Sequence, residues 1–153
     1  LIYKNNKWIP WWDGHLYKLG DEYEGVTGGW VIKRCKDQST LASGTTKESN
    51  YLKLHISAKN TGACIVTRNK IDITNYNELH LTLRLASGPQ FGLYDDYTEG
   101  LSWNNYVAGK GIETTNADVV IDISNKAGEY YIGMVDYTTG NGEYLYVSEV
   151  WLT

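Results

Sequence analysis

One polar, aromatic stretch, residues 94–106 (YDDYTEGLSWNNY), carries the side chains best suited to contact a ligand. Aromatic rings and hydrogen-bonding groups alternate in it, and the candidate ligand-binding residues are Tyr94, Asp95, Asp96, Tyr97, Glu99, Trp103, Asn104 and Tyr106. A sugar needs both types, because its C–H face packs on an aromatic ring and its hydroxyls pair with carboxylates or amides. The stretch therefore predicts a carbohydrate-binding loop. The alternative is a solvated loop whose rings pack on the core.

A second aromatic cluster lies near the N-terminus, where Trp8, Trp11 and Trp12 fall within five residues. Exposed indole rings stack on sugars, and we count Trp11 and Trp12 as further candidate ligand-binding residues. The same rings are equally suited to covering a sheet face or docking a neighbouring subunit, so both alternatives stay open.

Two acidic groups suggest a structural calcium ion, because Ca²⁺ prefers carboxylate and carbonyl oxygens. The first is Asp95, Asp96 and Glu99, and the second is Glu22 and Glu24 together with Glu149. Neither has the spacing of an EF-hand loop. No other cofactor or metal site is expected, since His15, His55 and His80 are scattered along the chain.

The sequence contains no constellation that indicates catalysis. Paired carboxylates invite comparison with glycosidases, but nothing in the sequence marks one carboxylate as acid and another as nucleophile. No Ser-His-Asp order, phosphate-binding loop or dinucleotide fingerprint is present. We expect the protein not to be an enzyme.

Bulk properties restrict the class of protein and its partners. A chain of 153 residues fits one domain, and a net charge of −4 without long Lys or Arg runs disfavours nucleic acid as a partner. No stretch approaches the roughly 20 apolar residues of a membrane helix. Cys35 and Cys64 lie in apolar runs, which favours buried free thiols over a disulfide. Without an initiating Met or a signal-peptide pattern, the chain is expected to be an excised domain of a longer protein.

Alternation of apolar and polar residues predicts an all-β fold. Leu79, Leu81, Leu83 and Leu85 recur every second residue, as in a core strand and unlike any helix face. About nine or ten such strands, with Gly- and Asn-rich turns, predict a two-sheet antiparallel β-sandwich of jelly-roll topology. Residues 1–24 are expected to form an aromatic arm or hairpin, and residues 25–153 the sandwich. Residues 118–153 form the closing meander, with a β-bulge near Ser148 and Glu149 to bring the last strand into phase.

Three segments resemble a known family. They are residues 26–30 (VTGGW), residues 69–79 (NKIDITNYNEL) and the pieces IDIS, YYIG and VSEVWL between residues 121 and 152. They are similar to the jelly-roll domains of phage and prophage tail or minor structural proteins of Gram-positive bacteria, which in turn resemble carbohydrate-binding modules. The resemblance implies a receptor-binding role on bacterial cell-surface glycan, sister subunits in a virion or tail assembly, and a virion or extracellular location. A structural or assembly module without a glycan ligand is the alternative.

Overall fold

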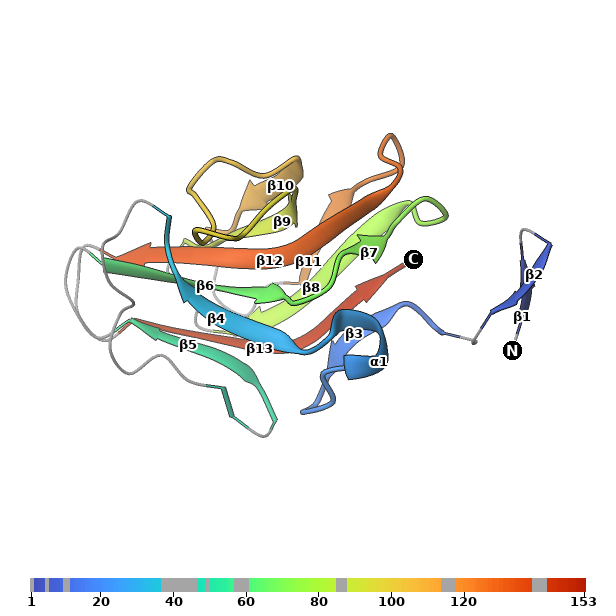
Figure 1. Ribbon diagram of the computed structural model, residues 1–153. Coiled ribbons are helices and arrows are strands. Elements are labelled where there is room, and N and C mark those ends of the chain that lie inside the picture. The colour runs from blue at the N-terminus through green and yellow to red at the C-terminus, as the bar shows by residue number, and fades with distance from the viewer. Residues whose placement is uncertain are drawn as a thin grey trace.

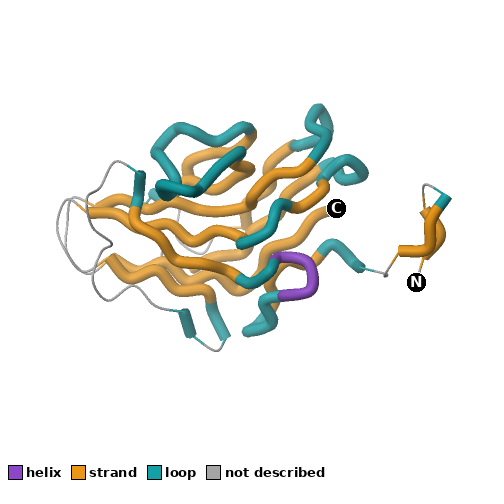
Figure 2. Tube along the Cα trace, viewed as in Figure 1, coloured by secondary structure: helices purple, strands orange, loops and turns teal. Residues whose placement is uncertain are grey.

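The computed structural model is a β-sandwich, in which two antiparallel sheets pack face to face (Figures 1 and 2). It describes residues 2–4, 6–9, 12–36, 47–48, 50–56, 61–84, 88–113, 118–138 and 143–153. The predicted all-β sandwich is confirmed.

Six strands form the first sheet and five form the second. The first sheet has the order β10 (Ala108–Gly111), β9 (Gln90–Tyr94), β12 (Glu129–Thr138), β6 (Thr61–Thr67) and β4 (Trp30–Arg34), with β7 (Ile71–Asp72) also paired to β12. The second has the order β11 (Asp118–Asp122), β8 (Glu78–Arg84), β13 (Glu143–Leu152) and β3 (His15–Lys18), with β5 (Leu52–Ile56) also paired to β13. Short strands such as β3 and β7 raise the number above the nine or ten predicted.

The core lies between the sheets and follows from the alternation in the sequence. In β8, Leu79, Leu81 and Leu83 are buried, whereas His80 and Thr82 between them are half-buried on the outer face. Each fully buried leucine contributes about 2 kcal/mol to stability. The same pattern in β11 buries every second residue.

A β-bulge lies in β13, as predicted. Val147 pairs with Leu83 of β8 and Glu149 pairs with Thr82, which leaves Ser148 without a partner in the ladder. The extra residue shifts the phase by one, so that Val147 and Val150 both face the core.

The N-terminal segment contributes to the sandwich from residue 15 onward, earlier than the sequence suggests. Strand β3 pairs with β13, and its Leu16 and Tyr17 are buried. Within the described part of the chain, the hairpin of β1 (Ile2–Lys4) and β2 (Lys7–Ile9) stands away from the sheets (Figure 1). A single helical turn, α1 (Glu24–Thr27), follows β3.

Candidate functional site

The loop between β9 and β10 covers the outer face of the first sheet (Figure 2). Leu101 at its centre is 1% exposed and enters a second, smaller core, together with Cys35, Cys64, Val66, Tyr94 and Val135. The Leu101 carbonyl accepts a hydrogen bond from Lys36 N (2.9 Å), and Leu101 N donates to Cys64 Sγ (3.4 Å). The next anchor is Gly100 at φ 94°, where a Cβ would overlap the Arg34 carbonyl oxygen. These contacts fix the loop on the sheet.

Two of the aromatic rings predicted to contact a sugar, those of Tyr94 and Tyr97, are packed against other parts of the protein. Tyr94 is 2% exposed, and burial raises its pKa well above the usual value. Tyr97 packs edge-on against Tyr131, with ring centroids 4.5 Å apart, and its hydroxyl donates to the Arg68 carbonyl (3.2 Å). Tyr94 therefore belongs to the second core and offers no open ring face. Tyr97 is half-buried and helps to hold the loop.

Trp103 and Asn104 lie at the tip of the loop. Trp103 is 41% exposed, the most open ring of the stretch. Asn104 adopts φ 60° and is held by Gln90, which accepts from Asn104 N (2.6 Å) and donates Nε2 to Asn104 Oδ1 (2.5 Å). The Asn104 amide oxygen is therefore engaged in fixing the turn.

The loop acids lie in an open environment. Asp95, Asp96 and Glu99 are exposed. The backbone N–H of Thr98 and then its hydroxyl donate to Asp96 Oδ1 (3.0 and 2.8 Å), and these bonds lower the pKa of Asp96. Glu99 lies 4.0 Å from Lys36 Nζ.

A pocket of about 260 Å³ forms on this loop. Its lining is mostly polar and contains five of the ten predicted residues; it consists of Lys36, Tyr94, Asp95, Asp96, Glu99, Gly100, Ser102, Asn105, Tyr106 and Val107. The half-buried Tyr106 contributes a ring. Trp103, Asn104 and Tyr97 are not in the lining. The arrangement supplies several hydrogen-bonding groups beside one aromatic surface.

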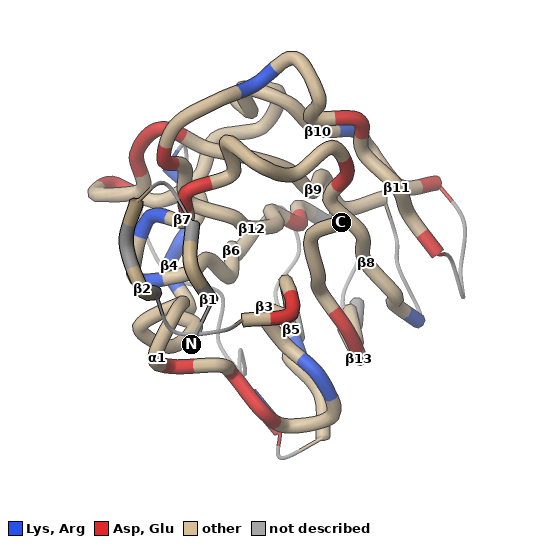
Figure 3. The backbone as a smooth tube through the Cα atoms, turned by 90° about the vertical axis from the view of Figure 1, so that its right-hand side faces the viewer, with Lys and Arg blue, Asp and Glu red and all other residues tan. Residues whose placement is uncertain are grey.

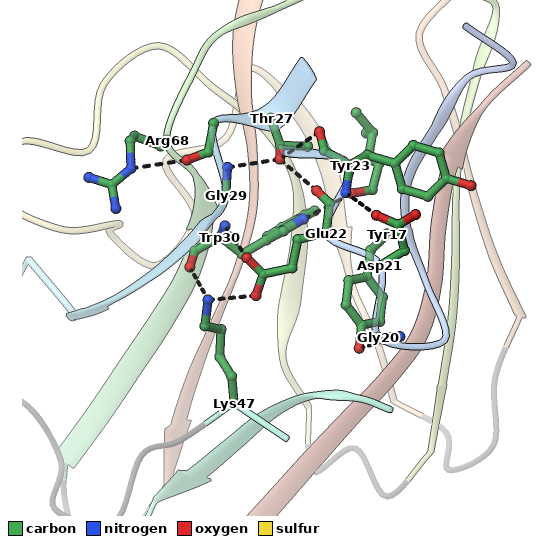
Figure 4. A network of polar contacts seen from close by, with 12 residues as sticks. Tyr17, Gly20, Asp21, Glu22, Tyr23, Thr27, Gly29, Trp30, Lys47 and Arg68 are labelled. Carbon is green, nitrogen blue, oxygen red and sulfur yellow. Dashed lines mark hydrogen bonds and ion pairs between the residues drawn. The ribbon is translucent and has the colours of Figure 1, made fainter. Parts of the chain in front are cut away.

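Neither of the two acidic groups suggested as calcium sites forms a set of converging ligands. Among the described residues, no three His, Cys, Asp or Glu side chains converge as a metal site. In the second acidic group, Glu22 accepts from Trp30 N (3.3 Å) and Lys47 Nζ (2.5 Å), as Figure 4 shows. Glu149 contacts His15 Nε2 (2.6 Å) and Lys18 Nζ (3.7 Å). These carboxylates are already used in protein contacts.

The N-terminal tryptophans have different positions. Trp11 lies outside the described residues. Trp12 is half-buried against the main core, donates Nε1 to the His15 carbonyl (2.6 Å) and meets Tyr76 edge-on. Trp8 in the hairpin is 69% exposed. Trp12 also lines a groove, beside Asp13, Asp21, Tyr23, Glu24, Gly25 and Val26, which we call the acidic groove.

Sequence reasoning missed a row of rings on the outer face of the second sheet. His80 and Trp151 stack at 4.8 Å and 12°, Trp151 and His15 at 6.3 Å and 25°, and His15 and Tyr23 at 5.9 Å and 23°. At 4.8 Å the planes overlap, so His80 covers one face of Trp151, and the row is a packed stack rather than a flat sugar platform. Alternation places His80 on the outer face, but the register that joins three strands cannot be read locally.

Within the described part of the chain, no helix has the length and apolar character needed to cross a bilayer.

Comparison with known proteins identifies the fold. No protein-family model and no curated protein matches the chain. Among solved structures, it is similar to the family 11 carbohydrate-binding module of the cellulosomal cellulase Lic26A-Cel5E of Clostridium thermocellum, with 12% identity, a TM-score of 0.53, and coverage of 89% of this chain and 93% of that one. It is also similar to a low-affinity xylan-binding module, CBM86, from Roseburia intestinalis (9%, TM-score 0.51, 81% and 94%).

A third neighbour is the K1 cleaved adhesin domain of Lys-gingipain from Porphyromonas gingivalis W83 (13%, TM-score 0.51, 81% and 89%). At these identities the likeness concerns the fold alone. The chain therefore has the jelly-roll-like β-sandwich fold found in carbohydrate-binding modules.

Proposed function

We propose that this protein is a non-catalytic carbohydrate-binding module and that the pocket on the β9–β10 loop binds the sugar. One observation carries the proposal: a single pocket gathers the ring of Tyr106 with the side chains of Asp95, Asp96, Glu99 and Asn105. This pairing of a ring with planar hydrogen-bonding groups matches the two needs of a sugar.

The loop is fixed before any ligand arrives, which favours binding. The second core holds Leu101, and the Tyr106 ring lies close to β10, where a Cβ at Gly109 would be 2.8 Å from Tyr106 Cγ. A preformed site avoids the entropic cost of ordering a loop on binding. Because the pocket is small and polar, we expect a Kd on the order of 10⁻⁴ M for one site. Several copies side by side would strengthen attachment.

The biological setting is a further part of the proposal. The resemblance of residues 26–30, 69–79 and the last strands to phage tail and minor structural proteins supports a receptor-binding role. In that setting the ligand is a bacterial cell-surface glycan, and the protein is located on a virion or outside the cell.

Glycan-array and cell-wall pulldown experiments test the loop pocket. The variant Asp95→Ala/Asn105→Ala removes two exposed side chains, and we expect retention to fall about tenfold with an unchanged thermal midpoint. The matched control is Asp72→Ala/Asn75→Ala, also exposed but outside the pocket. Equal retention of the loop variant and the wild type would remove the pocket from consideration. Trp103→Ala, tested in parallel, determines whether the exposed ring extends the site.

A second candidate function, that of an assembly module, is favoured by the β1–β2 hairpin. Its Tyr3 and Trp8 are 60% and 69% exposed and lie 5.3 Å apart at 57°. Large exposed rings are typical of contact surfaces between proteins. In this function the hairpin packs on a sister subunit.

A further inference from the structure

The acidic groove is separate from the loop pocket and shares no lining residue with it. It has a volume of about 700 Å³ and lies between the segment that enters β3, the turn after β3, and α1. Figure 3 shows acidic stretches of the backbone beside α1 and β3 at this end of the molecule. The groove combines two aromatic rings with three carboxylates.

Both rings are held in place by His15. Tyr23 stacks one face on the His15 ring, and Trp12 Nε1 donates to the His15 carbonyl (2.6 Å). In Figure 4 the Tyr23 side chain points away from the contacts of Glu22 with Trp30 and Lys47. Tyr23 also lines the groove, so part of this side chain borders the space that a ligand would occupy. Tyr23 and Trp12 are half-buried, so their orientation is set before binding.

Two of the three carboxylates are also oriented by the backbone. His15 N donates to Asp13 Oδ1 (3.0 Å), and Tyr23 N donates to Asp21 Oδ1 (2.8 Å). The first of these bonds is the main cause of a lowered pKa at Asp13, which therefore stays ionised at neutral pH. The pKa of Tyr23 is raised, first by burial and then by the charges of Asp13 and Asp21. Negative potential thus reaches the Tyr23 ring.

The neighbouring lysines form their ion pairs with other carboxylates, and Lys47 lines an adjoining hollow together with Asp21 and Glu24. Lys18 contacts Glu149 (3.7 Å), and Lys47 contacts Glu22 (2.5 Å). Among the residues that the structure describes, no Lys or Arg forms an ion pair with Asp13, Asp21 or Glu24, and the His15 ring atom Nδ1 is 3.1 Å from Asp13 Oδ2. A positively charged ligand would complement the groove.

We propose that the acidic groove binds a glycan that carries free, protonated amines, such as units of a 2-amino-2-deoxyhexose. Tyr23 and Trp12 provide faces for the sugar ring and attract the ammonium group, and Asp13, Asp21 and Glu24 pair with it. The ring faces favour an amino sugar over a basic peptide, because a pyranose presents a flat C–H surface beside its charge. The choice of a sugar rests on the proposed carbohydrate-binding function.

Two oligosaccharides that differ in charge test the groove. We would titrate the protein with a tetramer of β-1,4-linked glucosamine and with its N-acetylated counterpart, by calorimetry at a pH where the amines are protonated. We expect about tenfold tighter binding of the charged tetramer, and this preference falls as salt is added. Equal binding of the two tetramers, or no binding of the charged one, would overturn the proposal.

Charge-neutralising variants locate the site. The groove variant is Asp13→Asn/Asp21→Asn/Glu24→Gln, in which the amide oxygens still accept the backbone N–H bonds. The control is Glu113→Gln/Asp118→Asn/Glu129→Gln, three exposed acids outside the groove. Each variant raises the formal net charge of −4 by three, to −1. Only the groove variant should lose the preference for amines. Loss of this preference in both variants would indicate an effect of net charge and would contradict the proposal.

Two further measurements distinguish an amino-sugar site from a general cation surface, and the acidic groove from the loop pocket. Tetralysine that competes as well as the glucosamine tetramer would show a general cation surface and would overturn the amino-sugar assignment. The loop variant Asp95→Ala/Asn105→Ala should bind the charged tetramer as the wild type does. If the wild type binds this tetramer but retains no other glycan, the loop pocket fails and the groove stands.

Discussion

Cys64 shows how burial on both faces of a sheet controls the chemistry of one residue. Its side chain is fully buried, and burial raises the pKa of the thiol from 9.0 to about 11. The thiol donates to the Arg34 carbonyl (3.5 Å) and accepts from Leu101 N (3.4 Å). The predicted state of both cysteines, free and buried, is confirmed. Two pKa units reduce the thiolate population at pH 8 about a hundredfold.

Alkylation of Cys64 should be slow in the folded protein. In a Cys35→Ser background, iodoacetamide should react with the folded protein at pH 8 at least about a hundredfold more slowly than with the urea-unfolded chain. Mass spectrometry of quenched samples measures both rates, and comparable rates would contradict the burial of Cys64. The unfolded chain loses its thiol proton first, so this contribution to stability is complete below pH 9 and disappears between pH 9 and about 11.

Single residues of the candidate site were predictable by type but not by position. Residues 95–106 do form a loop, which contributes most of one pocket, whereas Tyr94 is the last residue of β9. The sequence could not separate Tyr94, which is 2% exposed, from Trp103, which is 41% exposed. Their burial depends on Leu101 anchoring the loop to the sheet, a long-range contact with Lys36 and Cys64. No local pattern encodes it.

At the scale of elements, β13 pairs with three strands and keeps its phase through one residue. It contacts β8, β3 and β5, and the bulge at Ser148 places both halves of its apolar pattern in the core. The bulge was predictable because Leu145 and Val147 are out of phase with Val150 and Leu152. The Ser148 side chain itself donates only to the Thr82 carbonyl (3.3 Å).

Deletion of Ser148 should therefore keep the fold and straighten the ladder. Without the extra residue, Val147 and Val150 are two positions apart, so Val150 and Leu152 still face the core opposite Leu81 and Leu79. The deletion removes the hydrogen bonds of Ser148 with Leu19 N and the Thr82 carbonyl, and should cost about 1 to 3 kcal/mol. Ser148→Ala loses the hydroxyl bond alone and should cost about 1 kcal/mol or less. Urea titrations followed by circular dichroism compare the two, and an unfolded deletion variant would contradict this role of the bulge.

Short elements were the least predictable. Helix α1 has four residues, too few to show a helical period. Gly28 ends it in a left-handed conformation at φ 69°, but the residue before it, Tyr23, is also left-handed at φ 47°, which its residue type does not indicate. Strand β3 is also four residues long, too short for a periodic signal, and it is held by its pairing with β13. By contrast, β8 and β9 were recognisable from alternation and apolar character. Length limits what periodicity can reveal.

At the scale of the whole molecule, the hairpin is the part least tied to the sandwich. Figure 1 shows β1 and β2 beyond the edge of the two sheets, and the described residues of the hairpin pair with one another. Its exposed Tyr3 and Trp8 are not part of the main core. Among the described residues, Trp12 is the first that packs against this core, and Leu16 is the first that is buried in it. Loss of the hairpin should therefore affect self-association without changing the stability of the sandwich.

Removal of residues 1–11 tests this separation. The thermal midpoint should shift by no more than about 2 °C, because none of the described core residues is lost. Self-association of the intact chain at high concentration should disappear, because Tyr3 and Trp8 are removed. Size-exclusion chromatography with light scattering measures the second effect, and Tyr3→Ala/Trp8→Ala is the matched control. A strictly monomeric chain at both lengths would argue against the assembly function.

The loop over the first sheet also divides the molecule into a constrained side and a variable side. In β12, the residues from Ile132 to Asp136 are all buried, because one face meets the main core and the other meets the loop. Substitutions there meet packed atoms in both directions, whereas the outer face of β8 and β13 ends in half-exposed side chains such as Thr82 and Tyr146. Substitutions should therefore be tolerated better at positions such as Thr82 and Tyr146 than between Ile132 and Asp136.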